Sequence, residues 1–357
     1  MDDEIQKPLI TTVIPTYRRP KLLRWAINSV LNQTYPHFQV CVYDNASGDK
    51  TADVVAELAQ KDPRIKYHCH PKNIGVLKNF NYGMEHVDTP FFSFLSDDDI
   101  LLPEFYQIAL EGFEKHPEAI FSATGVICIY SQSNIVSVPI LSWKTGGLYQ
   151  PLEGLLAILK YGHPTWTGIL FRREIIEKIG LLDQEVGAAS DWDFELRAAA
   201  HFPFVISLKP GAIFVIHPGN IPTQIRFQDT WPGWLKIIRN LTKDEHIPSD
   251  TRIFTEHMLT ECLKKRLFLI GIRSILRRND KDVYKAAEVF RNYYHQKTKA
   301  FLLYITAKIC NYLPFIYCFF AFLRKIYRFL LWKKSEPLRE KYREILSFYH
   351  REEHIYL

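Results

Sequence analysis

Short apolar runs alternate with amphipathic stretches over the first hundred residues, and this rhythm restricts the possible folds more than composition does. The runs have the length and the β-branched and aromatic content of buried strands, and they lie at 9–14, 38–43, 64–69 and 91–95. Stretches with helical periodicity separate them, at about 20–33, 50–60 and 76–86. This order predicts an α/β fold with a mostly parallel sheet flanked by helices, and we expect Pro15 to end the first strand.

Three of these strands run into polar residues that can bind a ligand. Thr16 and Tyr17 follow the first strand, Asp44 follows the second, and Asp97 to Asp99 follow the fourth. Because the carboxyl ends of parallel strands share one edge of a sheet, these side chains should converge there. Asp44 alone can be a turn former, but a turn does not need three adjacent carboxylates that repel one another. A Mg²⁺ or Mn²⁺ ion would remove that repulsion, and such ions usually take phosphate oxygens as further ligands.

Charge is distributed unevenly along the 357 residues, although the formal net charge is only +6. Residues 1–230 hold 20 Lys and Arg against 26 Asp and Glu, whereas residues 231–357 hold 25 against 13. We therefore expect two domains with these boundaries, the second one basic, helical and rich in aromatic residues. The acidic first part is a poor candidate for binding nucleic acid.

The cysteines and the N-terminus indicate where the protein works. The six cysteines form no CxxC pair, which excludes a disulfide scaffold and a zinc ribbon and favours a reducing compartment. The acidic, polar start of the sequence does not have the pattern of a secretory signal peptide. We therefore expect a cytoplasmic protein.

A series of short motifs lies in order between about residues 8 and 220. They are VIPTYRR at 13–19, DNASGD at 44–49, NIGVLKN at 73–79, FLSDDDILLP at 94–103, GILFRRE at 168–174, GLLD at 180–183 and SDWD at 190–193. Together, in this order and spacing, they resemble the glycosyltransferases of family 2, which have the GT-A fold. Two positions depart from the family pattern. Ser96 replaces the first aspartate of the acidic motif, and Ser190 replaces the glutamate before the last one.

The resemblance implies a metal-dependent enzyme that moves a sugar from a nucleoside diphosphate sugar to an acceptor, with inversion at the anomeric carbon. The implied cofactor is Mn²⁺ or Mg²⁺, and the implied nucleotide is UDP, with dTDP and GDP as alternatives. Asp191 would be the general base, and Asp98, with Asp99 beside it, would bind the metal. The implied nucleotide site comprises Pro15, Thr16, Tyr17, Arg19, Asp44, Asn73, Lys78 and Asp97.

Reaction chemistry supports these roles. A divalent cation stabilises the charge that develops on the departing diphosphate, and a carboxylate such as Asp191 can take the proton of the acceptor hydroxyl. Asp191 and Asp193 also begin an expected helix, so a capping role is the alternative, and both roles are compatible. Trp192 lies between these two aspartates, where its ring can form a wall for a sugar, and Trp192 and Asp193 are both candidates for contacts with the acceptor or the sugar.

Three further residues have two interpretations each. Trp166 and Thr167 are candidates for contacts with the acceptor or the sugar, and the alternative for Trp166 is a side chain packed in the interior. His217 follows a strand-like run and is a candidate for a third metal ligand or a phosphate contact, with a plain turn histidine as the alternative.

The basic second part of the chain contains a long segment without acidic residues. Residues 297–334 hold eight Lys and Arg and no Asp or Glu, and residues 301–323 carry only one charge, Lys308. Basic residues interleaved with aromatic ones can bind nucleic acid, but the long apolar runs fit lipid better. The length permits a membrane-spanning helix, yet Pro314, Lys308 and the basic residues at both ends favour a segment that lies on an anionic membrane surface. Packing inside the protein or in a homo-oligomer is the alternative.

These observations predict a cytoplasmic transferase that is bound peripherally to the inner face of the cell membrane and acts in polysaccharide biosynthesis. The acceptor would be a glycan or a lipid-linked molecule. Two other functions are considered. A nucleotidyltransferase would need a glycine-rich phosphate loop after the first strand, and residues 15–19 contain no glycine. A non-catalytic nucleotide- or glycan-binding protein would not need Asp98 and Asp191.

Overall fold

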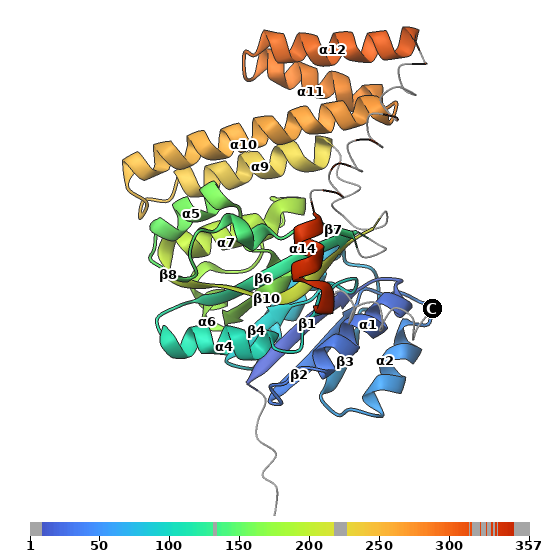
Figure 1. Ribbon diagram of the computed structural model, residues 1–357, viewed down its shortest axis with the longest axis vertical. Coiled ribbons are helices and arrows are strands. Elements are labelled where there is room, and N and C mark those ends of the chain that lie inside the picture. The colour runs from blue at the N-terminus through green and yellow to red at the C-terminus, as the bar shows by residue number, and fades with distance from the viewer. Residues whose placement is uncertain are drawn as a thin grey trace, which may run out of the picture. The chain divides into compact units, whose positions relative to one another are not determined.

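The computed structural model describes residues 9–130, 134–217, 227–313 and 335–345, together with the single positions Phe315, Phe322, Ile326, Leu330 and Lys333. The chain divides into two compact units (Figure 1), and the statements below concern their described residues. The first unit is drawn from Met1–Gln184, Asp191–His217 and Leu338–Leu357, and the second from Glu185–Ser190 and Pro218–Pro337. The domain boundary that the charge distribution suggests, between residues 230 and 231, stays a prediction.

One ten-stranded sheet forms the centre of the first unit. Its strands are β1 (Ile10–Thr16), β2 (Phe38–Asp44), β3 (Ile65–Cys69), β4 (Phe91–Phe94), β5 (Ile100–Leu101), β6 (Phe121–Tyr130), β7 (Asn134–Ser137), β8 (Gly147–Tyr149), β9 (Ile169–Arg172) and β10 (Phe204–Ile216). Their order is β3-β2-β1-β4-β9-β6-β10-β5, with β7 beside β6 and β8 beside β10. The β3-β2-β1-β4 half is parallel, as is the long β6–β10 pair, so the predicted mostly parallel α/β sheet is confirmed.

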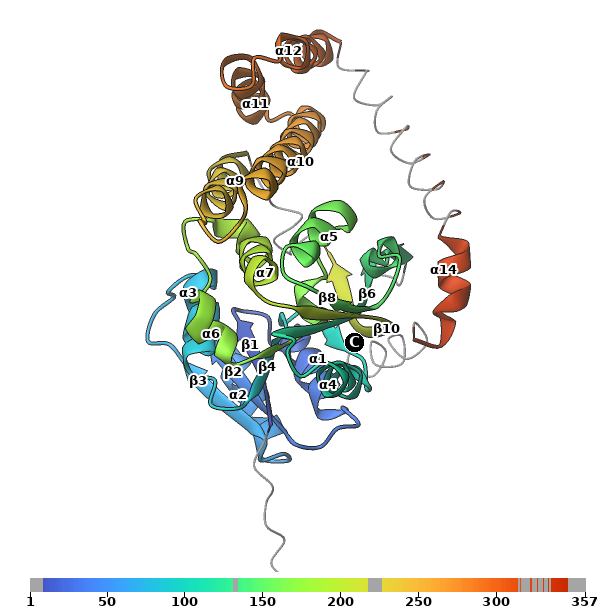
Figure 2. The ribbon, with the colours of Figure 1, turned by 90° about the vertical axis from the view of Figure 1, so that its left-hand side faces the viewer.

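Helices cover both faces of this sheet, and Figure 2 shows α1 and α4 on one side and α3 and α6 on the other. The helices of this unit are α1 (Pro20–Leu31), α2 (Thr51–Ala59), α3 (Val76–Glu85), α4 (Phe105–Lys115), α5 (Glu153–Tyr161), α6 (Glu174–Ile179) and α7 (Ser190–His201), with short 3₁₀ turns η1 (Pro139–Ser142), η2 (Trp166–Gly168) and η3 (Gly187–Ala189), the last belonging to the second unit. Successive residues of β1 point to opposite faces of the sheet, so this strand packs against a helix on each side. Ile10 and Ile14 join the core with Leu23 of α1, whereas Val13 faces Gly83 of α3.

The first strand does not end at Pro15, so that prediction is wrong. β1 continues to Thr16, and Pro15 lies opposite Tyr43 of β2. The carbonyl of Val13 accepts a hydrogen bond from Leu95 at 3.1 Å on the β4 side, and alternate residues of a strand point the same way. The nitrogen of Pro15 therefore faces the side of β4, where pairing stops at Val13, and the missing N–H leaves no ladder bond unmade.

The second unit consists, in its described residues, of η3 and long helices. These are α9 (Phe227–Thr242), α10 (Ser249–Leu276), α11 (Asp280–Asn292) and α12 (Lys297–Tyr312), and a short helix, α14 (Glu336–Lys341), follows later in the chain. Helix α10 contacts α9, α11 and α12, and its buried residues Leu259, Leu263 and Leu267 recur every four positions, as on a helix with one buried face. Among the helices described, none combines the length and the apolar content needed to cross a bilayer.

Candidate active site

The strand directions bring four chain segments to one edge of the sheet. β1 runs parallel to β2 and β4, and β4 is joined through the antiparallel strand β9 to β6, which runs parallel to β10. The carboxyl ends of β1, β2, β4 and β10 therefore point the same way. Thr16, Asp44, the Asp97–Asp99 turn and His217 follow these ends, and in open α/β sheets ligands bind at this edge.

Two adjacent carboxylates form the centre of the site. Thr16 Oγ1 donates to Asp97 Oδ2 at 2.8 Å, and Arg19 Nη1 donates to Asp97 Oδ1 at 3.1 Å and to Asp98 Oδ2 at 2.7 Å. His217 Nε2 lies 3.0 Å from Asp98 Oδ2. The structure thus brings together five of the residues singled out from the sequence, which come from the ends of β1, β4 and β10 and the start of α1.

The electrostatics of the pair follow from burial and from like charge. The side chains of Asp97 and Asp98 are each only 7% exposed. Burial, together with the neighbouring charge of Asp98, raises the pKa of Asp97 to about 6, against the lowering effect of Arg19 and Thr16. Two carboxylates held this closely are stabilised by a cation, and the Arg19 guanidinium supplies one from within the chain.

Asp99 has a different environment from its two neighbours. It is buried, its Oδ2 accepts a hydrogen bond from Thr167 Oγ1 at 2.6 Å, and its Oδ1 accepts one from the N–H of Val215 at 3.0 Å. Burial, and then the charge of Asp98, raise its pKa well above the usual value. Asp99 therefore ties the turn after β4 to η2 and to β10.

Asp44 organises the turn after β2. Its Oδ1 accepts from the backbone N–H of Ser47 at 2.9 Å and from Ser47 Oγ at 2.5 Å, and its Oδ2 accepts from the hydroxyl of Tyr67 at 2.7 Å. Burial and the Asp44 carboxylate raise the pKa of Tyr67, so this hydroxyl keeps its proton and donates. The aspartate is thus held by donors from its own turn and from β3.

A pair of asparagines fastens the next loop to this turn. Asn45 Nδ2 donates to Asn73 Oδ1 at 3.1 Å, and Asn45 Oδ1 accepts from the N–H of Ile74 at 2.8 Å. The predicted nucleotide residue Asn73 is therefore adjacent to the Asp44 turn. Lys78 is exposed in the first turn of α3, and Tyr17 is exposed after β1 with the Arg18 guanidinium carbon 5.0 Å from its ring centroid.

The start of α7 carries the predicted base. Asp191 is partly exposed in the first turn, and its Oδ1 accepts from the N–H of Trp192 at 2.8 Å. The ring of Trp192 lies 4.4 Å from that of His163, centroid to centroid. Asp191, with Trp192, and the pair Asp97 and Asp98 each have their own hydrogen-bond partners, and we describe them as two clusters.

Element η2 connects these two clusters. The ring of Trp166 stacks on Phe94 at the end of β4, at 4.8 Å between centroids, and lies 5.6 Å from Phe194 on α7. The next residue, Thr167, is buried and bonded to Asp99. Asp193 is also buried, and its Oδ2 accepts from Arg197 Nε at 2.7 Å. Thr167 and Asp193 are therefore engaged inside the protein, whereas Trp166 and Trp192 are both partly exposed, Trp166 with its ring packed on Phe94.

Two functional candidates escaped the sequence reasoning. Glu195 is completely buried on α7, and its Oε2 lies 3.3 Å from His163 Nδ1. Burial raises the pKa of Glu195 to about 7, a net value that includes the lowering effect of His163 and a smaller raising effect of Asp191. The sequence contained one signal for Glu195: it comes four positions after Asp191, so the two residues lie on the same face of the helix. The partner His163 is 32 positions away, and nothing local indicates it.

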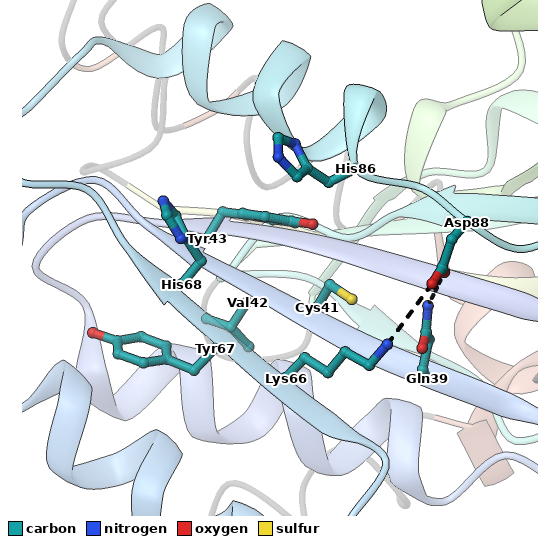
Figure 3. Close-up of a pocket in the computed structure, with 9 residues that line it drawn as sticks. All are labelled: Gln39, Cys41, Val42, Tyr43, Lys66, Tyr67, His68, His86 and Asp88. Atoms are coloured by element: carbon teal, nitrogen blue, oxygen red, sulfur yellow. Dashed lines mark hydrogen bonds and ion pairs between the residues drawn. The ribbon is translucent and has the colours of Figure 1, made fainter.

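A separate open cavity of about 110 Å³ lies over β2 and β3 (Figure 3). Its lining residues are Gln39, Cys41, Val42, Tyr43, Lys66, Tyr67, His68, His86 and Asp88. Gln39 Nε2 donates to Asp88 Oδ1 at 2.6 Å across one end of it. Burial raises the pKa of the Cys41 thiol to about 11, so this cysteine is not a nucleophile at neutral pH. The cavity shares Tyr67 with the surroundings of Asp44 but contains none of the predicted catalytic carboxylates.

Comparison with known proteins now identifies the domain. Residues 11–180 match the family model described as glycosyl transferase family 2. An uncharacterized glycosyltransferase of Rickettsia prowazekii is 25% identical over 256 residues, which cover 69% of this chain and 77% of the relative. A GalNAc(5)-diNAcBac-PP-undecaprenol beta-1,3-glucosyltransferase of Campylobacter jejuni is 38% identical over 96 residues, which cover 27% of this chain and 31% of that protein.

A solved structure shares the fold. The crystal structure of Staphylococcus aureus TarS 1–349 in complex with UDP-GlcNAc superposes with a TM-score of 0.64, covering 85% of this chain and 92% of that chain at 15% sequence identity. The family match falls on the segment that contains β1 to β4 and the acidic turn described above. Residues 11–180 therefore form a glycosyl transferase family 2 domain, and the chain is a glycosyltransferase with the GT-A fold.

Proposed function

We propose that this glycosyltransferase is an inverting enzyme that moves a sugar from a UDP-sugar to a hydroxyl group of a glycan or lipid-linked acceptor. The observation that carries the proposal is the cluster of Asp97, Asp98, Arg19 and His217 at the carboxyl edge of the sheet. This cluster offers carboxylates, a guanidinium and an imidazole, which suit a diphosphate together with its counter-ion. TarS was crystallised with UDP-GlcNAc and with UDP, which supports a uridine nucleotide as the donor.

The residues present fit a divalent cation. Asp98 and His217, whose Oδ2 and Nε2 lie 3.0 Å apart, would hold the ion, and Arg19 Nη1, which donates to the same Asp98 oxygen at 2.7 Å, would have to move aside. Mn²⁺ and Mg²⁺ commonly use few protein ligands and take phosphate oxygens as others. When bound there, the ion would stabilise the charge on the departing diphosphate. We leave Asp99 out of the ligand set, because both its oxygens accept hydrogen bonds from Thr167 and Val215.

The nucleotide would lie along the ends of β1 and β2. Thr16 holds Asp97 on the ribose side, and Tyr17 offers an exposed ring to the base. Asp44 would accept the imide N–H of uracil through Oδ2, in exchange for the Tyr67 hydroxyl that donates to this oxygen. Asn73 and Lys78 flank the same region, so Asn73 would contact the nucleotide and Lys78 would approach its negative charge.

The acceptor would bind at the start of α7. Asp191 would take the proton of the acceptor hydroxyl while the acceptor oxygen bonds to the anomeric carbon and the bond from that carbon to the diphosphate oxygen breaks. Trp192, stacked near His163, would form a wall for the acceptor sugar. Trp166, Thr167 and Asp193 are assigned to support, because each packs or bonds within the protein.

The test is a panel of nucleotide sugars with Mn²⁺ or Mg²⁺, scored by release of free nucleoside diphosphate. We expect turnover with a UDP-sugar and a loss of at least about 100-fold in kcat for Asp98→Asn and for Asp191→Asn. Asp53→Asn, at an exposed position in the first turn of α2, is the matched control and should retain turnover. Asp98→Asn that turns over like the wild type would contradict the metal role. Release of pyrophosphate from nucleoside triphosphates would instead indicate a nucleotidyltransferase.

A further inference from the structure

Helix α12 uses one face to pack inside the second unit. Ala300, Leu303, Ala307 and Cys310 are buried at spacings of three and four residues, the periodicity of a single helix face. Leu303 lies against Gly271 of α10 so closely that a side chain at Gly271 would collide with it. This buried face of α12 is therefore covered by other helices of the second unit.

The opposite face of α12 is apolar as well, and it is exposed. Phe301 is 62% exposed and Tyr312 is 80% exposed, and Tyr304 and Ile309 lie between them with nearly half of their surface exposed. The spacings of these four residues place them on one side of the helix, and we call them the aromatic face of α12. A surface helix usually turns polar residues outward, so an aromatic outer face indicates that something other than water covers it.

The charged residues of α12 itself are all lysines, and Asp280 of α11 accepts a hydrogen bond from Asn311 of this helix at 2.7 Å. Lys297 lies one turn before Phe301, and Lys308 lies one turn before Tyr312, with its Nζ 5.7 Å from the ring centroid of Tyr304. The sequence contains no acidic residue between positions 297 and 334. A lysine whose stem lies along an aromatic ring while its ammonium group reaches outward is typical of the interface between apolar and aqueous layers.

We propose that the aromatic face of α12 docks on an anionic lipid bilayer, with its rings at the depth of the headgroups and its lysines on the lipid phosphates. A second copy of the chain is a poorer occupant, because two such faces would bring Lys297 and Lys308 of both copies together, and α12 itself has no acidic residue to pair with them. Residues 313–334, the segment that follows α12, are also a poor candidate for covering the aromatic face, since they add five Lys and Arg and no acidic residue.

The described positions beyond α12 agree with this occupant. Phe315, Phe322, Ile326 and Leu330 are helical, apolar and exposed. The rest of the segment predicted to bind membranes, including Pro314, lies outside the described residues. Docking through α12 would hold the enzyme at the surface where lipid-linked acceptors reside, and this consequence rests on the proposed function.

The experiment is flotation of the full chain with two vesicle types, phosphatidylcholine alone and a 3:1 mixture of phosphatidylcholine and phosphatidylglycerol. We expect the protein to float with the anionic vesicles, to dissociate from them at high salt, and not to float with the neutral vesicles. The double variant Lys297→Gln/Lys308→Gln should lower the partition coefficient about 30-fold, because each basic residue near an anionic surface contributes about fivefold.

The triple variant Phe301→Ser/Tyr304→Ser/Tyr312→Ser should lower binding more than tenfold, since it removes the rings that enter the interface. The matched control is Val136→Ser/Leu141→Ser, which removes two similarly exposed apolar residues of the first unit and should float like the wild type. Retained far-UV circular dichroism and nucleotide binding confirm folding of each variant. Wild-type flotation by the triple variant, or equal binding to both vesicle types, would overturn the proposal. A dimer that the triple variant converts to a monomer, without vesicle binding, would assign the face to a second copy. Flotation needs no turnover, so its outcome is independent of the proposed reaction.

Discussion

Replacing Glu195 by glutamine should stabilise the protein at alkaline pH and leave its stability nearly unchanged in acid. The wild-type carboxyl is completely buried on α7, faces His163 at 3.3 Å, and lies near the charge of Asp191. Burial raises its pKa from 4.5, the ordinary value expected in the unfolded chain, to about 7 in the folded protein. The folded protein therefore binds the proton more tightly than the unfolded chain does.

The sign and size of the effect follow from linkage. A raised folded-state pKa contributes stability that is fully present below pH 4.5 and is lost as the pH rises through about 7. The interval between these pKa values corresponds to about 3 kcal/mol of unfolding free energy. Glutamine keeps the shape of the protonated carboxyl and never ionises, so the variant does not suffer this loss. We expect similar stabilities at pH 5 and an advantage of up to about 3 kcal/mol for the variant at pH 8.5.

Urea unfolding of wild type and variant at pH 5.0 and pH 8.5, followed by far-UV circular dichroism, measures this difference. Glu177→Gln is the control, because Glu177 is exposed on α6 and pairs with Arg173 at the surface. Its effect should be small and nearly independent of pH. If the stability difference between wild type and Glu195→Gln is the same at both pH values, Glu195 does not have the buried, protonated environment described above.

Three further substitutions test other contacts. Thr167→Val removes the hydroxyl that donates to buried Asp99 and should lower the unfolding free energy by about 1–3 kcal/mol, whereas Thr167→Ser should lose much less; equal losses would contradict the role of this hydrogen bond. Gly83→Ala places a Cβ against Val13 and Tyr43 and should cost about 1–3 kcal/mol in thermal or urea unfolding. Adding Val13→Ala should recover part of that loss, and strict additivity would show that the two residues do not collide. Asp44→Asn should weaken UDP binding about 10- to 100-fold by calorimetry, since a charged acceptor is lost, and unchanged affinity would remove Asp44 from the nucleotide site.

Local sequence signals predicted the fold because they depend on near neighbours. The alternation of strands and helices predicts the parallel half of the sheet, and the rule that ligands bind at the carboxyl edge predicts that Thr16 and Asp97 lie together, as they do. The predicted end of β1 was wrong. A proline destabilises a strand only where its missing N–H would have bonded to a neighbouring strand, and the sequence does not show whether β4 still pairs beside Pro15. The resemblance to the family supplied the roles, which spacing alone would not have given.

Contacts between distant segments were the part that sequence reasoning did not reach. His163 meets Glu195, and Thr167 meets Asp99, only because η2 and α7 pack beside the turn after β4. Whether an acidic residue in such a motif reaches a ligand or is used inside the protein is decided by this packing. Asp98 contacts Arg19 and His217, whereas both carboxylate oxygens of Asp99, the next residue, accept hydrogen bonds from donors inside the protein.

The short turn η2 contacts both the turn after β4 and helix α7, the two elements that carry the proposed donor and acceptor sites. Trp166 rests on β4 and α7, and Thr167 bonds to the acidic turn, so two consecutive residues contact both elements. A change in volume here would misalign the proposed base with the donor while leaving each half intact. Efforts to redirect the enzyme to a new acceptor therefore have more freedom at Trp192, on the partly exposed surface of α7, than at η2.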